Sequence, residues 1–216
     1  AQVTTPRLVG ELDLPTSSLG LFAGSGQAWL SVVDQVLPED GTKVSIMALS
    51  LDGSGRPIAQ RLWNAAGPGW QRPFHAPILR PVGERDLLVA GLVIDNRFGS
   101  IWNFSRELDG RLLPRSRVEY DNRHFSDTEN RAMAVDEQGR RAFGSEDSTL
   151  RVFDILEDGL LQERGSMTLP GSVGCGGLTW TGRWLLASSG CRGSTSVALI
   201  DAADPDAPRL AATLTS

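Results

Sequence analysis

The chain has little lysine, histidine and cysteine, and each shortage excludes a class of protein. Lys43 is the single lysine among 21 basic residues, and no run of basic residues typical of a nucleic-acid-binding protein occurs. His75 and His124 are far apart, and the motifs CxxC, CxxCH and HExxH are missing, which argues against a histidine-based zinc site. The sequence also has no run of about 18 apolar residues, so it excludes a membrane-spanning helix.

The sequence also lacks helical periodicity, because no stretch longer than ten residues keeps a period of 3.6, and its pattern indicates strands instead. The 24 glycines and 12 prolines favour tight turns. Short apolar or alternating runs stand between turns rich in glycine, aspartate and asparagine, which is the pattern of β-strands. The sequence therefore predicts an all-β protein, with strands at 29–33, 44–50, 87–94, 99–104, 131–135, 141–144, 150–155, 177–180, 184–188 and 196–201.

The strands and turns repeat along the chain. Similar turns stand at 51–53, 108–110 and 157–159, and aligning them gives a period of roughly 45–58 residues, near that of propeller blades. The repeat predicts a single β-propeller domain over residues 1–216. It would contain about four blades of four antiparallel strands each, within units 17–64, 65–122, 123–170 and 171–216.

The two ends of the chain resemble each other. Residues 6–15 read PRLVGELDLP and residues 208–215 read PRLAATLT, and both look like the outer strand of a blade. Residues 1–16 are therefore predicted to form an extra outer strand whose blade lacks its inner strands. Two interpretations stay open: the chain belongs to a larger propeller completed by further residues or another chain, or it is a short, irregular propeller.

Two segments resemble the β-propeller phytases, a calcium-dependent family that removes phosphate from inositol hexakisphosphate. Residues 127–139 read DTENRAMAVDEQG and are followed by GSED at 144–147, similar to the family's Thr-Glu-Gly step, Asp-Glu-x-Gly turn and Glu-Glu-Asp strand end. Residues 177–179, 184–190 and 194–200 read GLT, WLLASSG and STSVALI, similar to the family's next strands. The resemblance extends over about residues 125–200.

The resemblance implies a calcium site that acts on phosphate. In the family, carboxylates hold calcium ions, which neutralise the substrate phosphate and activate water. Glu129, Glu146 and Asp147 match family carboxylates and are the implied metal ligands, with Glu129 and Glu146 as catalytic residues. The implied substrate is an inositol phosphate or another phosphorylated small molecule. Arginine suits phosphate recognition, so the candidate substrate contacts are Arg97, Arg131 and Arg192.

The sequence departs from the family at several of these positions. Ser145 replaces the first glutamate of Glu-Glu-Asp, and Gly174 and Gly176 stand where the family has an Asp-x-Glu ligand pair. These losses remove negative charge from the expected cation site. The alternative function is therefore a non-catalytic propeller that serves as a scaffold or subunit, binding a protein or a small ligand.

The two cysteines frame one predicted hairpin. If its turn lies near residues 181–182, Cys175 and Cys191 lie at neighbouring strand ends, and a disulfide is expected; the alternative is two independent thiols. The chain starts at Ala1, which fits an exported protein, extracellular or periplasmic, whose signal peptide has been removed. A trimmed chain would begin in the same way.

Overall fold

The computed structural model is built from β-strands. It describes residues 16–24, 27–34, 43–71, 77–94, 97–119, 131–146, 148–170, 177–189 and 196–215, and these ranges contain no helix. Their strands form four antiparallel sheets, each of which we call a blade. The predicted all-β, propeller-like fold class is therefore confirmed. The extra outer strand predicted over residues 1–16 lies almost entirely outside the described residues.

The first two blades use the N-terminal half of the chain. Strand order in the first is β1(Thr16–Gly24), β2(Gln27–Asp34), β3(Val44–Leu51) and β4(Pro57–Ala65). In the second, the innermost position is shared by β5(Trp70–Gln71) and β6(Ile78–Val82), which both pair with β7(Asp86–Ile94); β8(Arg97–Arg106) and β9(Leu112–Glu119) follow.

The last two blades have the same order. The third contains β10(Arg131–Val135), β11(Arg141–Glu146), β12(Thr149–Ile155) and β13(Leu161–Thr168). The fourth contains β14(Leu178–Thr181), β15(Trp184–Ser189), β16(Ser196–Asp201) and β17(Arg209–Thr215). All ten strands expected from the sequence are present within a few residues of their predicted bounds.

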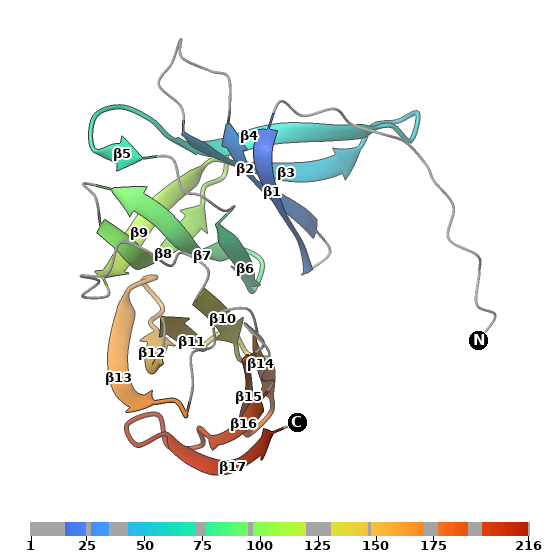
Figure 1. Ribbon diagram of the computed structural model, residues 1–216. Helices are drawn as coiled ribbons and strands as arrows, with labels where there is room; N and C mark the ends of the chain where they lie inside the picture. Colours follow the sequence, from blue (N-terminus) through green and yellow to red (C-terminus); the bar gives the residue numbers. More distant parts are fainter. Residues whose placement is uncertain are drawn as a thin grey trace, which may run out of the picture.

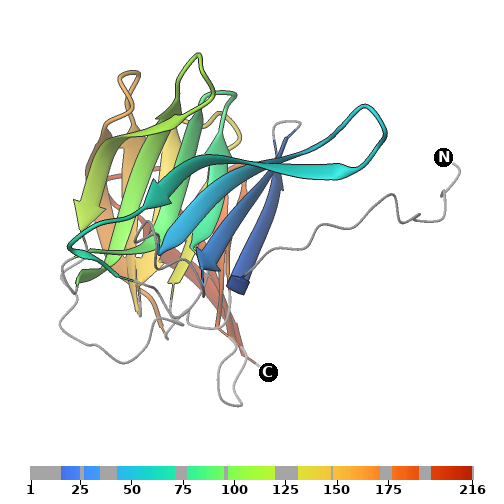
Figure 2. The same cartoon turned by 90° about the horizontal axis from the view of Figure 1, so that it is seen from above.

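The blades follow one another along an arc (Figure 1). Contacts between β1 and β6, between β6 and β10 and between β10 and β14 line up the innermost strands along the inner side of the arc. Seen from above, the strands of the blades stand side by side, and the hairpin of β3 and β4 projects beyond them (Figure 2). No helix in the described ranges is long and apolar enough to cross a membrane.

A separate hydrophobic cluster fills each space between neighbouring blades. Because side chains alternate between the two faces of a strand, one strand can supply two clusters. On β7, Leu87 and Val89 pack toward the first blade while Leu88 and Ala90 pack toward the third. Phe143 belongs to the cluster between the third and fourth blades. This two-sided burial explains why the middle strands read as continuous apolar runs.

The outer strand of every blade carries the same irregularity. In each blade the register between the third and fourth strands shifts once, which leaves one extra residue on the fourth strand. Such a bulge bends the strand and redirects a side chain. The extra residues are Leu62, Arg115, Arg164 and Ala211. The recurrence at one place supports reading the four sheets as copies of one structural unit.

Candidate functional site

The strands of each blade begin and end at two opposite sides of the sheet, and we call these two sides its edges. At the turn edge lie the tight turns that join the first strand to the second and the third to the fourth. In the third blade these are residues 136–140 and 156–160. At the opposite edge, which we call the loop edge, the first and third strands begin and the second strand ends. Arg131, Glu146 and Thr149 mark the loop edge of the third blade.

The described candidates from the sequence all lie at the loop edge. Arg131 is the first residue of β10 and Glu146 the last of β11, and their Cα atoms are direct partners in the antiparallel register. Arg97 is the first residue of β8 and pairs with Ile94 at the same edge of the second blade. The backbones of these three residues are placed, whereas their side chains lie outside the described part of the structure.

The other candidates fall outside the described residues, in segments that adjoin the loop edge along the chain. Glu129 precedes β10 by two residues, and Asp147 directly follows β11. Arg192 and Cys191 belong to the connection between β15 and β16, and Cys175 to the segment before β14. In chain order, each of these residues therefore stands next to a strand end of the loop edge.

Ser145 does not offer an oxygen to solvent. Its side chain is 4% exposed, and its Oγ atom has no hydrogen-bond partner among the described residues. The serine that stands where the family has a glutamate is thus buried. Within the described ranges, no group of three or more His, Cys, Asp and Glu side chains could hold a metal ion. The implied ligands lie outside that set, so their prediction stays untested.

Two aspartates of the turn edge hold their own turns through hydrogen bonds. Asp136 Oδ1 accepts hydrogen bonds from the backbone N–H groups of Arg140 (2.8 Å) and Arg141 (3.1 Å). Asp52 Oδ1 accepts from the backbone and hydroxyl of Ser54 and from the Arg56 N–H, and these bonds, that of the hydroxyl foremost, lower the pKa of Asp52. The repeated Asp-containing turns of the sequence are therefore structural elements.

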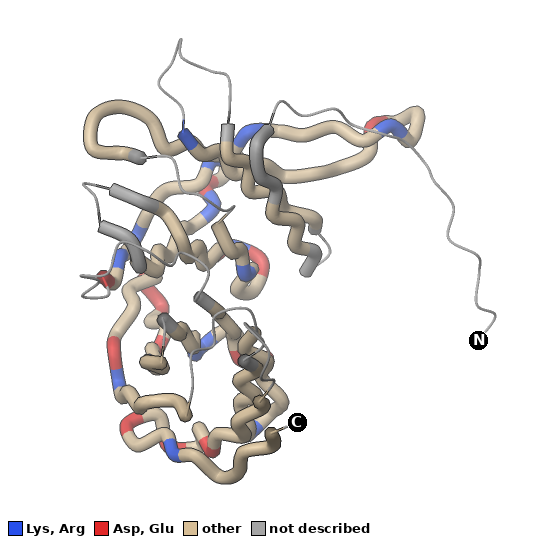
Figure 3. Tube along the Cα trace, in the orientation of Figure 1, with Lys and Arg blue, Asp and Glu red and all other residues tan. Residues whose placement is uncertain are grey.

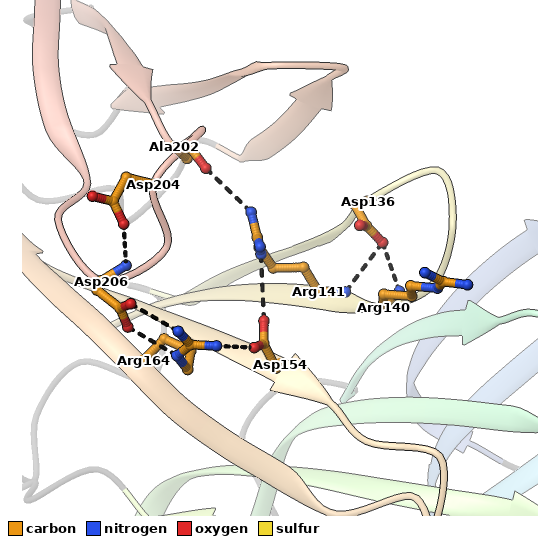
Figure 4. Close-up of polar contacts among 8 residues, drawn as sticks. All are labelled: Asp136, Arg140, Arg141, Asp154, Arg164, Ala202, Asp204 and Asp206. Atoms are coloured by element: carbon orange, nitrogen blue, oxygen red, sulfur yellow. Dashed lines mark hydrogen bonds and ion pairs between the residues drawn. The ribbon is translucent and has the colours of Figure 1, made fainter.

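An ion-pair network ties the third blade to the fourth at the turn edge (Figure 4). Arg164, the bulged residue of β13, binds Asp206 of the β16–β17 turn through two hydrogen bonds of 2.8 and 2.7 Å, and it also binds Asp154. Arg141 contacts Asp154 at 3.5 Å and donates to the Ala202 carbonyl at 3.4 Å. The hydrogen bonds with Arg164 lower the pKa of Asp206, and the bonds with Asp206 and Asp154 raise the pKa of Arg164.

Charge of both signs surrounds one cavity that is lined by described residues. Its volume is about 1060 Å³, and it lies at the turn edge of the second, third and fourth blades. Its lining includes Asp136, Arg141, Asp154 and Arg183, all of which take part in the turns and ion pairs of this edge. Figure 3 shows acidic and basic residues interspersed along the described trace. The cavity thus has no single charge sign that would select a ligand.

A second cavity of about 450 Å³ is lined by the innermost strands. Arg80 of β6 lies in its wall, beside Phe22 of β1 and Val135 of β10. Nothing in the sequence around Arg80 marks it as a functional residue, because a single arginine in a short strand usually lies on the surface. Its surroundings become evident only when three blades are assembled around it.

Comparison with known proteins identifies the fold and no family. No protein-family profile matches the chain, and no curated protein matches it by sequence. A crystal structure of a protein from Lactobacillus plantarum is 18% identical, with a TM-score of 0.61 over 92% of this chain and 55% of that one. A functionally unknown protein from Desulfotomaculum acetoxidans is 16% identical, with a TM-score of 0.49 over 80% of this chain and 50% of that one.

A third structure is a hypothetical selenium-binding protein from Sulfolobus tokodaii. It is 11% identical, with a TM-score of 0.45 over 68% of this chain and 39% of that one. The chain therefore spans about half the length of the first two structures. At 18% identity, the likeness to the Lactobacillus plantarum protein shows a shared blade architecture.

Proposed function

We propose that the chain is a calcium-dependent phosphomonoester hydrolase that acts on inositol phosphates or similar phosphorylated small molecules. The observation that carries the proposal is the pairing of Arg131 with Glu146 at the loop edge of the third blade. Along the chain, Glu129 stands two residues before β10 and Asp147 directly after β11, so two further carboxylates adjoin this pair in sequence.

The hairpin is a firm base for such a site. Five consecutive residue pairs join β10 to β11, and the Asp136 turn closes their far end. Behind the edge, Ala132 and Met133 are buried between the blades. Carboxylate oxygens suit calcium, and an adjacent guanidinium suits a phosphate oxygen. A calcium ion held there would neutralise substrate charge and activate a water molecule for attack on phosphorus.

Phosphate release from inositol hexakisphosphate, measured with calcium and with a chelator, tests this function. We expect calcium-dependent release that falls at least tenfold in Glu146→Gln. Glu157→Gln is the matched control, because Glu157 is an exposed glutamate of the same blade at the opposite edge. Release that survives in Glu146→Gln, or that is independent of calcium, would contradict the proposal.

A second candidate function is a non-catalytic scaffold. It is favoured by Gly174 and Gly176, which stand where the resembled family has two carboxylates. In that case the wild-type chain would release no phosphate, and its loop edge would bind a ligand or partner without turnover. A partner chain that continues the arc of blades belongs to this proposal and is supported by the match to only 55% of the Lactobacillus plantarum structure. Light scattering of the purified chain would detect self-association.

We also propose an exported protein with a Cys175–Cys191 disulfide. Gly177, two residues after Cys175, and Ser188, three residues before Cys191, are joined by two hydrogen bonds of 2.8 and 3.0 Å, which supports this pairing. Mass spectrometry after thiol alkylation without reductant tests this pairing. An unmodified peptide pair supports the disulfide, and two alkylated cysteines contradict it.

A further inference from the structure

The second cavity contains a cationic side chain that three different blades hold in place. Arg80 Nε donates a hydrogen bond of 3.1 Å to the Met133 carbonyl of β10, and Nη1 donates one of 2.9 Å to the Leu79 carbonyl. The guanidinium carbon lies 4.7 Å from the centroid of the Phe22 ring on β1. Arg80 is thus fixed by β1, β6 and β10, the innermost strands that follow one another along the arc (Figure 1).

No carboxylate among the described residues neutralises Arg80. Both of its hydrogen-bond acceptors are backbone carbonyls, and Nη2 has no partner within the described ranges. Burial lowers the pKa of Arg80, with no acidic neighbour acting in the opposite direction. A charge that is partly removed from water is normally paired, because its desolvation is otherwise uncompensated. This arginine therefore has unused capacity to bind an anion.

The rest of the cavity is suited to a small organic molecule. Its volume of about 450 Å³ is within the usual range for ligand pockets. Phe22, Pro81 and Trp180 give it apolar and aromatic walls. Two acidic residues also line it: Asp136, whose Oδ1 atom is used by its own turn, and the exposed Glu137. An anion would therefore bind at the arginine end, away from the turn.

We infer that this cavity binds a small organic oxyanion, with its carboxylate or phosphate group against Arg80 and its apolar body against Phe22 and Trp180. The ligand needs an oxyanion group that accepts hydrogen bonds from Arg80 Nη2, and an apolar part about the size of one aromatic ring. This site is lined by the innermost strands of all four blades and does not depend on the calcium site of the proposed function.

Arginine side-chain NMR tests the inference directly. The Nε–Hε resonance of Arg80 should be protected and visible, because Nε donates to the Met133 carbonyl. Titration of the ¹⁵N-arginine-labelled chain with phenyl phosphate, and separately with benzoate, should shift this resonance in a saturable way and show which oxyanion binds more tightly. Neutral benzyl alcohol at the same concentrations should not shift it. An unchanged Arg80 resonance with both anions would overturn the inference.

Variants separate anion binding from general effects. We expect Arg80→Met to weaken phenyl phosphate binding at least tenfold, and Arg80→Lys to weaken it less because the charge is retained. Arg111→Met is the matched control, because the Arg111 side chain is 79% exposed at a hairpin turn; it should bind within twofold of the wild type. Equal affinity in Arg80→Met and the wild type would refute the site. If Arg80→Met does not fold, the wild-type titration decides alone.

Discussion

Gly165 on β13 is a position at which the packing of the third blade against the fourth leaves no room for a side chain. A methyl group at Gly165 would lie 2.5 Å from the Pro205 carbonyl oxygen and 2.8 Å from the carbonyl carbon and oxygen of Asp206. All three obstacles are backbone atoms, so a side-chain rotation cannot relieve the clash. We therefore expect Gly165→Ala to push the β16–β17 turn away from β13.

The cost follows from the usual penalty for overpacking. Inserting one methyl group into a well-packed contact costs about 1–3 kcal/mol of unfolding free energy. For a chain of this size, a loss of about 2 kcal/mol lowers the Tm by roughly 4–8 °C. Thermal unfolding and denaturant titration would measure this loss of stability, and we expect the m-value to stay unchanged. Because Asp206 moves with the turn, Asp206→Asn should destabilise the Gly165→Ala chain less than it destabilises the wild type.

Gly53→Ala is the matched control for this experiment. An added Cβ at Gly53 meets no atom within 4 Å, so the change should alter the unfolding free energy by less than about 0.5 kcal/mol. The reasoning would be refuted if Gly165→Ala were as stable as Gly53→Ala, because the third and fourth blades would then not pack as the structure shows.

Two further predictions concern buried hydroxyls and pH. Ser31→Ala should lower the free energy of unfolding by about 1 kcal/mol, because Ser31 Oγ donates a buried 2.7 Å hydrogen bond to the Pro77 carbonyl. Ser145→Ala should not change it measurably, because Ser145 Oγ lacks a partner among the described residues. Equal losses of unfolding free energy in denaturant titrations would contradict this contrast. Arg164 lowers the pKa of Asp206, so the Tm difference between wild type and Asp206→Asn should be full at pH 7 and shrink below about pH 4; a difference that persists at pH 2 would contradict it.

Local signals account for the part of the fold that the sequence predicted. The turns at Asp52, Asp109 and Asp158 were recognisable because each aspartate accepts a hydrogen bond from the backbone N–H two residues later. The buried middle strands were recognisable by their apolar runs. The innermost strand β1 was not, because its sequence TSSLGLFAG is rich in glycine and serine and has little strand preference.

Contacts between blades could not be predicted in this way. Arg164 and Asp206 are 42 residues apart, and they meet because a bulge redirects Arg164 toward the next blade. Arg80 likewise acquires its surroundings from Phe22 and Met133, which belong to other blades. Such contacts depend on how the blades pack, and a single sequence carries no local mark of that packing. The carboxylate candidates came from the family resemblance and the arginines from their suitability for phosphate, and strand order places the backbones of Arg97, Arg131 and Glu146 at the loop edge.

Calcium binding to the loop edge of the third blade is the central claim, and calorimetric titration of the purified chain with calcium chloride tests it most directly. We expect saturable binding in the wild type, at least tenfold weaker binding in Glu146→Gln, and unchanged binding in Glu157→Gln. A wild-type chain that binds no calcium, or a Glu146→Gln variant that binds it with wild-type affinity, would contradict a calcium site at this edge.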